Sequence, residues 1–209
     1  DNTFGKGLVQ APYPLSGDCS LLLTIARFYT PSGRLIQRDY SKGSFFDYYY
    51  KQNTATRNTR DQKTTDNGRV VYGGGGIMPD VFVATDTSSG SPYLSELYFT
   101  GTLNQFAFDL ADRERARLKA YGTYEQYALR YAITPGVLKD LERYAESQGI
   151  QVRPQDVNRS EAQVQWRLKA AIARNIWGDP GFYTIALQHD PIFERAAGLL
   201  VAKNEAAVH

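Results

Sequence analysis

Phe4-Gly5-Lys6-Gly7-Leu8-Val9-Gln10 sets a single lysine between two glycines, directly before an apolar stretch with strand character. Glycine permits backbone angles and close approaches that a side chain forbids. Because successive side chains of a strand point to opposite faces, Lys6, Leu8 and Gln10 are expected on one face. The pattern therefore predicts that the Lys6 amine and the Gln10 amide can meet the same partner group.

Two further blocks follow in order within the first 81 residues. One is Leu21-Leu22-Leu23-Thr24-Ile25-Ala26-Arg27-Phe28-Tyr29-Thr30-Pro31-Ser32-Gly33-Arg34, and the other is Gly73-Gly74-Gly75-Gly76-Ile77-Met78-Pro79-Asp80-Val81. With the opening stretch, they resemble the F-G-K-G-x-V-Q, T-x-A-R-Y-Y-T-P-S-G-R and G-G-x-G-I-x-P-D-V signatures of the carboxyl-terminal processing (tail-specific) proteases. These are serine enzymes with a Ser–Lys dyad. The resemblance indicates a C-terminal fragment of such an enzyme that starts just before the catalytic lysine.

The resemblance implies roles for two residues of the opening stretch. Lys6 is expected to be the catalytic general base, and Gln10 is expected to position it. The family's nucleophilic serine and its peptide-binding PDZ module lie upstream of the lysine, whereas the first serine here is Ser16. The fragment alone is therefore expected to be inactive. The implied substrates are protein or peptide chains, cut near the C-termini of exported proteins in the bacterial periplasm or cell envelope.

Both glycine motifs also have other interpretations. A lone Gly-Lys-Gly is most often a solvated turn. It is not a phosphate-binding loop, because that motif needs an earlier Gly and a Ser or Thr directly after the Lys. Successive N–H groups of residues 73–76 can cradle an anion, although a flexible turn between two strands is the favoured interpretation.

Composition narrows the class of protein. Lys plus Arg number 24 and Asp plus Glu number 22, and a formal charge of only +2 argues against nucleic-acid binding. The single cysteine, Cys19, excludes an internal disulfide, and with only two histidines no metal site is expected. No apolar run reaches the length of a membrane span. Membrane association is therefore expected only through upstream segments, and no cofactor is predicted.

The first part of the sequence has strand and turn patterns. Strands are expected at residues 8–12, 20–29, 34–37, 69–72 and 80–84. Residues 20–29 form a nearly continuous apolar run, which is typical of a strand buried on both faces, and Thr30-Pro31-Ser32-Gly33 predicts a tight turn. Residues 52–68 lack an apolar anchor, which indicates a mobile surface loop or an insertion. Five aromatic residues within 45–50 predict a helical turn that plugs a core or an interface, with a ligand surface as the alternative.

After the linker Thr87-Ser88-Ser89-Gly90-Ser91-Pro92, every pattern is helical. Helices are expected from residue 93 to the charge pairs at 112–115, at 124–131, from Thr134-Pro135 to Gly149, from Ser160-Glu161 to Gly178, and from Asp190-Pro191 onward. Trp166 and Trp177 are expected in a core or an interface. The predicted fold class is α+β. The resemblance implies a partial mixed β-sheet of a crotonase-like protease core in residues 1–87, followed by an all-helical C-terminal domain in residues 92–209.

Two classes of function remain open. One is the C-terminal portion of a serine endopeptidase. The other is a non-catalytic helical module for assembly or for holding substrate. Strand edges without partners invite pairing with another copy of the chain, so a homo-oligomer is expected.

Overall fold

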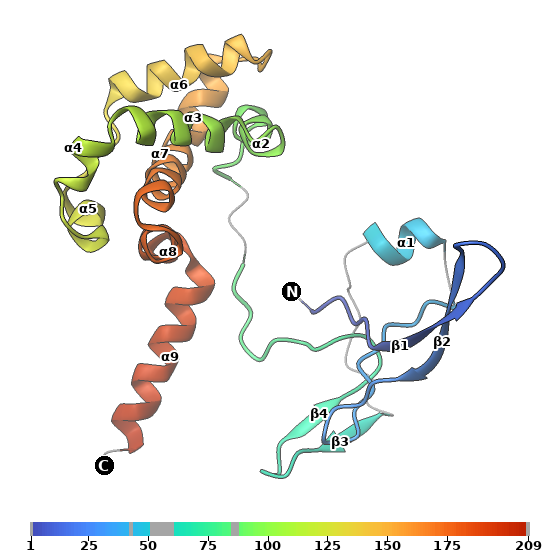
Figure 1. The fold of residues 1–209 in the computed structure, drawn as a ribbon. Coiled ribbons are helices and arrows are strands. Elements are labelled where there is room, and N and C mark those ends of the chain that lie inside the picture. Colours follow the sequence, from blue (N-terminus) through green and yellow to red (C-terminus); the bar gives the residue numbers. More distant parts are fainter. Residues whose placement is uncertain (1, 42–43, 51–60, 85–87, 208–209) are drawn as a thin grey trace. The chain divides into compact units, whose positions relative to one another are not determined.

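The computed structural model describes residues 2–41, 44–50, 61–84 and 88–207, the side chains of 202–207 excepted. The chain divides into two units, Asp1–Phe82 and Val83–His209, here called the strand unit and the helical unit. Figure 1 shows strands and a short helix in the strand unit, whereas the described elements of the helical unit are all helices. The predicted α+β class with a helical C-terminal region is confirmed.

The described residues of the strand unit form two antiparallel strand pairs and one short helix. Its elements are β1 (Leu8–Pro14), β2 (Ser20–Arg27), α1 (Phe45–Tyr50), β3 (Gln62–Thr64) and β4 (Val70–Tyr72). β1 pairs with β2, and β3 pairs with β4. Among the described residues the strands therefore form antiparallel pairs only, where the sequence suggested part of a mixed sheet.

A β-bulge interrupts the β1–β2 pair near the start of β1. Val9 faces Ala26, whereas its neighbour Gln10 faces Thr24, so Ile25 is the extra residue of β2. A bulge of this kind bends the strand and increases its twist. The bulge therefore lies beside Gln10, one of the two predicted site residues.

The turn predicted after β2 is confirmed. The Gly33 amide donates to the Thr30 carbonyl at 2.8 Å, and the Thr30 amide donates to the Arg34 carbonyl at 3.0 Å. Gly33 has a φ of +77°, a left-handed conformation that is strained for residues with a side chain. The turn therefore fixes the backbone of Arg34.

Two of the predicted strands are not formed. Residues 34–37 make only an isolated bridge between Tyr29 and Leu35. The carbonyls of Leu35 and Ile36 accept instead from amides of the glycine stretch at 73–76. Residues 80–84 form no strand. An apolar pattern alone does not supply the neighbouring chain that a strand needs for its hydrogen bonds.

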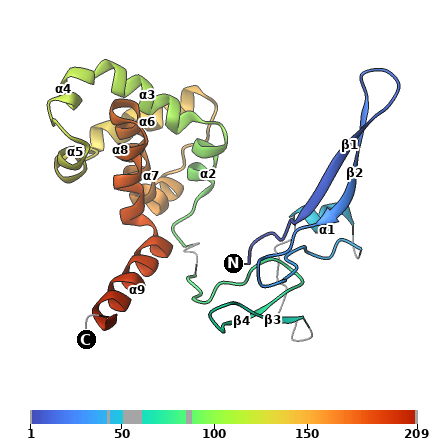
Figure 2. The same ribbon diagram turned by 60° about the horizontal axis from the view of Figure 1, so that its bottom comes forward.

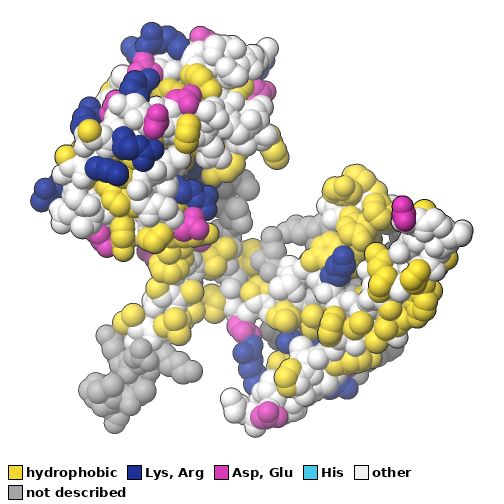
Figure 3. Space-filling view, viewed as in Figure 1, with side chains coloured by type: hydrophobic (Ala, Val, Ile, Leu, Met, Phe, Trp, Pro, Cys, Tyr) yellow, Lys and Arg dark blue, Asp and Glu magenta, His cyan; other side chains and the backbone are white. Residues whose placement is uncertain are grey.

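The prediction that β2 is buried on both faces is wrong for this chain. Every residue of β2 is exposed, and Leu22 and Ile25 expose 61% and 57% of their surface. Figure 3 shows hydrophobic side chains spread over the surface of the strand unit. The sequence pattern gives the preference of these side chains for burial, and the described part of the chain does not provide the partner surface.

The predicted loop at 52–68 is partly corrected. Residues 52–60 lie outside the described residues, whereas Gln62–Thr64 form β3 and pair with Val70–Tyr72. The Gly68 amide donates to the Thr65 carbonyl at 2.8 Å, which closes the hairpin. The polar composition of this segment did not indicate a strand. β3 forms because it pairs with β4, and its own apolar content does not determine that pairing.

The helical unit contains seven α-helices longer than five residues and two shorter elements in its described part. They are α2 (Pro92–Phe99), α3 (Thr102–Arg113), α4 (Arg115–Lys119), α5 (Tyr124–Arg130), α6 (Pro135–Ser147), α7 (Pro154–Trp177), α8 (Asp179–Ala186), η1 (Leu187–His189) and α9 (Pro191–Ala207). Figure 2 shows α9 extending away from the other helices. The predicted N-cap at Thr134 is confirmed, since its hydroxyl accepts from the Val137 amide.

The helical unit differs from the prediction at α7 and at α8. α7 begins at Pro154 rather than at Ser160. Ser160 lies inside the helix, where its hydroxyl donates to the Asp156 carbonyl instead of capping the helix. α8 was not predicted. It begins directly after Gly178, whose φ of +72° ends α7, and it has a proline in its first turn.

The core of the helical unit forms around α7, which packs against α2, α3 and α8. Its fully buried large side chains are Tyr127, Leu97, Leu118, Leu141, Leu168, Ile172 and Ile185. A buried polar pair joins α2 to α7: the Ser91 hydroxyl donates to the Ser160 hydroxyl at 2.8 Å and accepts from the Leu94 amide. Each buried hydroxyl therefore has partners, as a stable core requires.

Candidate active site around Lys6

The backbone on both sides of Lys6 is fixed by hydrogen bonds. The Arg38 amide donates to the Gly5 carbonyl at 2.7 Å, and the Phe28 amide donates to the Gly7 carbonyl at 2.8 Å. The Gly7 amide in turn donates to the side-chain oxygen of Gln37 at 2.8 Å. Segments far apart in the sequence therefore hold the short stretch that carries the lysine.

Both glycines that flank Lys6 are closely packed, and backbone contacts leave no room for a side chain at Gly5. Gly5 has a φ of +82°, and a Cβ at this position would lie 2.8 Å from the Gly76 nitrogen and 2.9 Å from the Ile36 carbonyl oxygen. A Cβ on Gly7 would lie 3.0 Å from the Ile36 side chain. Gly5 and Gly7 are buried, so a solvated turn does not describe this backbone.

The side chains of Lys6 and Gln10 are both exposed. Lys6 precedes β1, so the regular alternation of the strand starts only at Leu8 and does not extend back to the lysine. In the part of the chain that the structure describes, neither side chain makes a hydrogen bond or an ion pair. The predicted meeting of the Lys6 amine with the Gln10 amide at one partner group therefore stays a prediction.

Gln37 is a residue of this region that the sequence did not single out. It is 5% exposed, and its side-chain nitrogen donates to the Arg38 carbonyl at 2.7 Å and to the Tyr48 hydroxyl at 3.0 Å. Together with the bond from the Gly7 amide, these bonds connect the lysine-bearing stretch, through the Gln37 side chain, to the Arg38 backbone and to α1. Its only signal in the sequence was its place shortly after the T-P-S-G-R turn.

α1 packs against the residue that begins the lysine-bearing stretch. The rings of Phe4 and Tyr48 meet edge to face with centroids 5.3 Å apart, and Phe4 and Tyr49 are 6.0 Å apart. The Arg38 guanidinium lies 5.8 Å from the Phe4 ring and 5.6 Å from the Tyr48 ring. Phe46 and Tyr50 stack on each other elsewhere on α1 and remain 63% and 72% exposed. One face of the aromatic helix therefore supports the lysine-bearing stretch, and the other is open.

Three amides of the glycine stretch at 73–76 bond within the chain, which argues against an anion cradle built from successive amides. Gly73 donates to the Asp61 carbonyl at 3.0 Å, Gly74 to the Leu35 carbonyl at 2.8 Å, and Gly76 to the Ile36 carbonyl at 2.8 Å. These three amides are therefore engaged. The favoured interpretation is also corrected, because β4 precedes the glycines and no described strand follows them.

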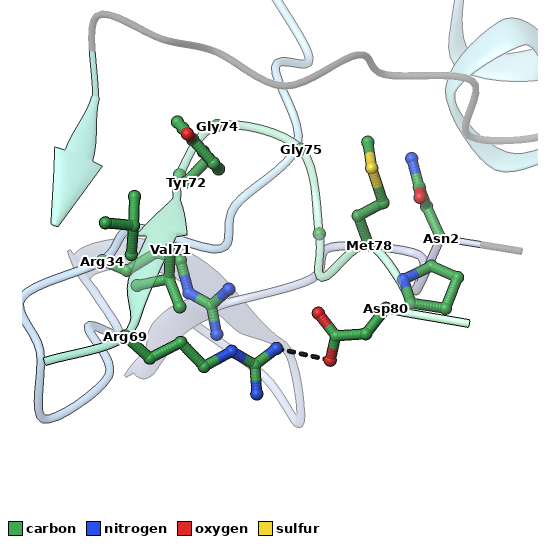
Figure 4. Close-up of a pocket in the computed structure, with 13 residues that line it drawn as sticks. Asn2, Arg34, Arg69, Val71, Tyr72, Gly74, Gly75, Met78 and Asp80 are labelled. Carbon is green, nitrogen blue, oxygen red and sulfur yellow. Dashed lines mark hydrogen bonds and ion pairs between the residues drawn. The ribbon is translucent and has the colours of Figure 1, made fainter. Parts of the chain in front are cut away.

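A hollow of about 210 Å³ lies beside the glycine stretch (Figure 4). Its charged lining residues among those described are Arg34, Arg69 and Asp80. Arg69 forms an ion pair with Asp80, drawn as a dashed line in the figure. Because Gly76 also packs against Gly5, this hollow and the lysine-bearing stretch share one wall.

Among the described residues, the groups with shifted pKa values lie in the helical unit. Burial raises the pKa of Tyr127, whose hydroxyl donates to the Lys169 carbonyl at 3.2 Å. Burial lowers the pKa of Lys169, whose amine donates to the Ala128 carbonyl at 2.6 Å. Both groups are explained by packing and hydrogen bonds within the helices, so neither shift indicates a second catalytic site.

No candidate metal centre emerges from the described residues, where no cluster of three or more His, Cys, Asp or Glu side chains is suitably placed. Among the helices of the described chain, none combines the length and apolar character needed to cross a bilayer. Cys19 is an exposed free thiol.

Comparison with known families gives one match within the strand unit. Residues 1–43 match peptidase family S41. The S41 segment contains Lys6 and the T-P-S-G-R turn, and the match confirms the family resemblance for this part of the chain. It places the segment in a family of serine peptidases, and it does not by itself assign a role to Lys6.

The helical unit matches a different family. Residues 93–178, which run from α2 to the end of α7, match a family of unknown function (DUF8443). No curated protein and no solved structure is significantly similar to the chain. The two matches therefore fall in different units, one in each.

Proposed function

We propose that this chain is the C-terminal portion of a carboxyl-terminal processing serine endopeptidase in which Lys6 is the general base. The supporting observation is the combination of a fixed backbone and an outward lysine. Hydrogen bonds and close packing hold Gly5 and Gly7. The Lys6 side chain is exposed and makes no hydrogen bond or ion pair with the described residues. Gly5, Lys6 and Gly7 lie inside the segment that matches a peptidase family.

In the proposed reaction, a serine supplied by an upstream segment attacks the carbonyl carbon of the peptide bond. Its hydroxyl proton moves to Lys6 Nζ, and the departing amine takes this proton as the C–N bond breaks. Water then hydrolyses the acyl-enzyme, with the same lysine as base. A lysine amine accepts a proton only in its uncharged form, which apolar surroundings favour. We therefore expect the serine-bearing segment to cover Lys6 in the active enzyme.

Gln10 is proposed as a positioning residue for Lys6. It carries no proton in the reaction, and it lies beside the β-bulge that bends the β1–β2 pair. The proposed substrates are protein or peptide chains cut near the C-termini of exported proteins, and the proposed site of action is the bacterial periplasm or envelope. Both follow from the family resemblance.

The test is steady-state cleavage of an unfolded protein by the complete peptidase that contains this chain. Lys6→Ala is expected to lower kcat by about 10²- to 10⁴-fold, the usual contribution of a general base, with its circular dichroism spectrum unchanged. Gln10→Ala is expected to lower kcat less. Lys119→Ala, an exposed lysine of α4, is the matched control. A well-folded Lys6→Ala enzyme with normal kcat would refute the assignment.

A second candidate function belongs to the helical unit, a non-catalytic module for assembly or for holding substrate. The observation in its favour is a core of its own, together with its match to a separate family. Removal of residues 88–209 from the complete peptidase is then expected to leave cleavage of a short peptide intact. The same truncation should reduce either the oligomeric size or the affinity for an unfolded protein. Retention of both properties would eliminate this candidate.

A further inference from the structure

The hollow beside the glycine stretch has an excess of positive charge. Of its charged lining residues, Arg34 and Arg69 contribute two cations and Asp80 contributes one anion. Asp80 is paired with Arg69. Figure 4 shows the Arg34 and Arg69 side chains entering the hollow from the same side. The lining therefore keeps one unbalanced positive charge.

Arg34 is the cation without a counter-charge. Its guanidinium makes no hydrogen bond or ion pair with any described residue, and its Nε atom is buried without a partner. A buried donor that lacks an acceptor is costly, so such a group calls for an explanation. The Arg69–Asp80 pair does not supply one, because the Asp80 carboxylate is engaged by the other arginine.

The backbone around Arg34 is held in place before any ligand arrives. Its amide donates to the Thr30 hydroxyl at 3.2 Å, and its carbonyl accepts from the Thr30 amide at 3.0 Å. The next carbonyl, of Leu35, accepts from Gly74 at 2.8 Å. A cation on a fixed backbone loses less conformational freedom when it binds an anion than one on a mobile loop does.

We propose that this hollow is a subsite for a carboxylate group of a peptide, bound by Arg34 with Arg69 at its side. One unbalanced charge matches a carboxylate, which carries one negative charge, better than a phosphate, which carries nearly two. The planar guanidinium also suits a carboxylate, with two parallel N–H···O bonds. The peptide nature of the ligand rests on the proposed function, because the hollow and the lysine-bearing stretch share the wall formed by Gly76.

The test measures binding without cleavage, on the chain of residues 1–209. The probe is acetyl-Ala-Ala-Ala with a free C-terminal carboxylate, compared with its C-terminal amide and with the amide of acetyl-Ala-Glu-Ala. Amide chemical shifts of the glycines at 73–76 report the site, and their titration gives the Kd. Loss of one charged hydrogen bond weakens binding by about 10- to 100-fold. Arg34→Gln should weaken binding of the carboxylate peptide by this factor, whereas Arg34→Lys should weaken it less.

Arg27→Gln, an exposed arginine of β2 in the same unit, is the control and should bind as the unaltered chain does. Binding of the free acid but not of its amide identifies a terminal carboxylate, and binding of the Glu peptide identifies an acidic side chain. Both outcomes support the subsite. Equal binding by Arg34→Gln, no shift at the glycines with either carboxylate peptide, or tighter binding of inorganic phosphate than of acetate would overturn it. Since no cleavage is read, failure here is separate from failure of the Lys6 assignment.

Discussion

Gln37→Met tests how the lysine-bearing stretch is held. The substitution keeps the length of the side chain but removes the acceptor of the buried Gly7 amide, now at 2.8 Å. A buried donor left without a partner costs about 1–3 kcal/mol. The free energy of opening at Gly7 should fall by that amount, because its amide loses this bond. Hydrogen exchange at Gly7 should then accelerate about 5- to 150-fold.

The assay is amide hydrogen exchange followed by NMR on the chain of residues 1–209. Both tryptophans lie in the helical unit, so unfolding followed by tryptophan fluorescence serves as an internal control and should not change. Gln62→Met, an exposed glutamine of β3, is the matched control variant. Exchange at Gly7 within twofold of the original chain would refute the claim that Gln37 fixes this backbone.

Three further outcomes follow from the structure. Ser91→Ala removes an N-cap and the bond to Ser160. It should lower the free energy of unfolding of the helical unit by about 1–2 kcal/mol, measured by urea titration followed by tryptophan fluorescence. An unchanged urea midpoint would contradict this. Burial, then two nearby cations, lower the pKa of His189, which stacks on Trp166. The unfolded chain then binds the proton more tightly, so stability is present above the ordinary histidine pKa near 6.5 and declines as the pH falls below it. The melting temperature should drop more between pH 7.5 and 5.5 in the original chain than in His189→Asn, and equal drops would be the contrary result. The exposed apolar face of β2 should cause self-association, so Leu22→Lys is expected to reduce the mass measured by light scattering, whereas a monomeric original chain would exclude association.

Local signals in the sequence predicted the features that depend on neighbouring residues. The T-P-S-G-R turn needs a proline and a glycine at fixed positions, and the start of α6 needs Thr134 before a proline. Gly5 and Gly7 were identified as positions of close approach. The structure adds the reason, which is contact with Ile36 and Gly76.

The features that were missed depend on distant partners. The sequence does not show whether a glutamine is buried, and Gln37 accepts a hydrogen bond from an amide 30 residues away. Ser160 has the chemistry of an N-cap, yet the helix begins at Pro154 and uses the serine inside its turns. The apolar run of β2 indicated burial, but a pattern of side chains does not show which surface covers them.

The central claim is that Lys6 takes the proton of the attacking serine. The most direct measurement is the rate at which a fluorophosphonate reagent labels that serine in the complete peptidase, because labelling needs the activated hydroxyl but no substrate. Lys6→Ala should slow labelling by at least about 100-fold, while Lys119→Ala labels at the original rate. Labelling of the folded Lys6→Ala enzyme within a few-fold of the original rate would contradict the claim.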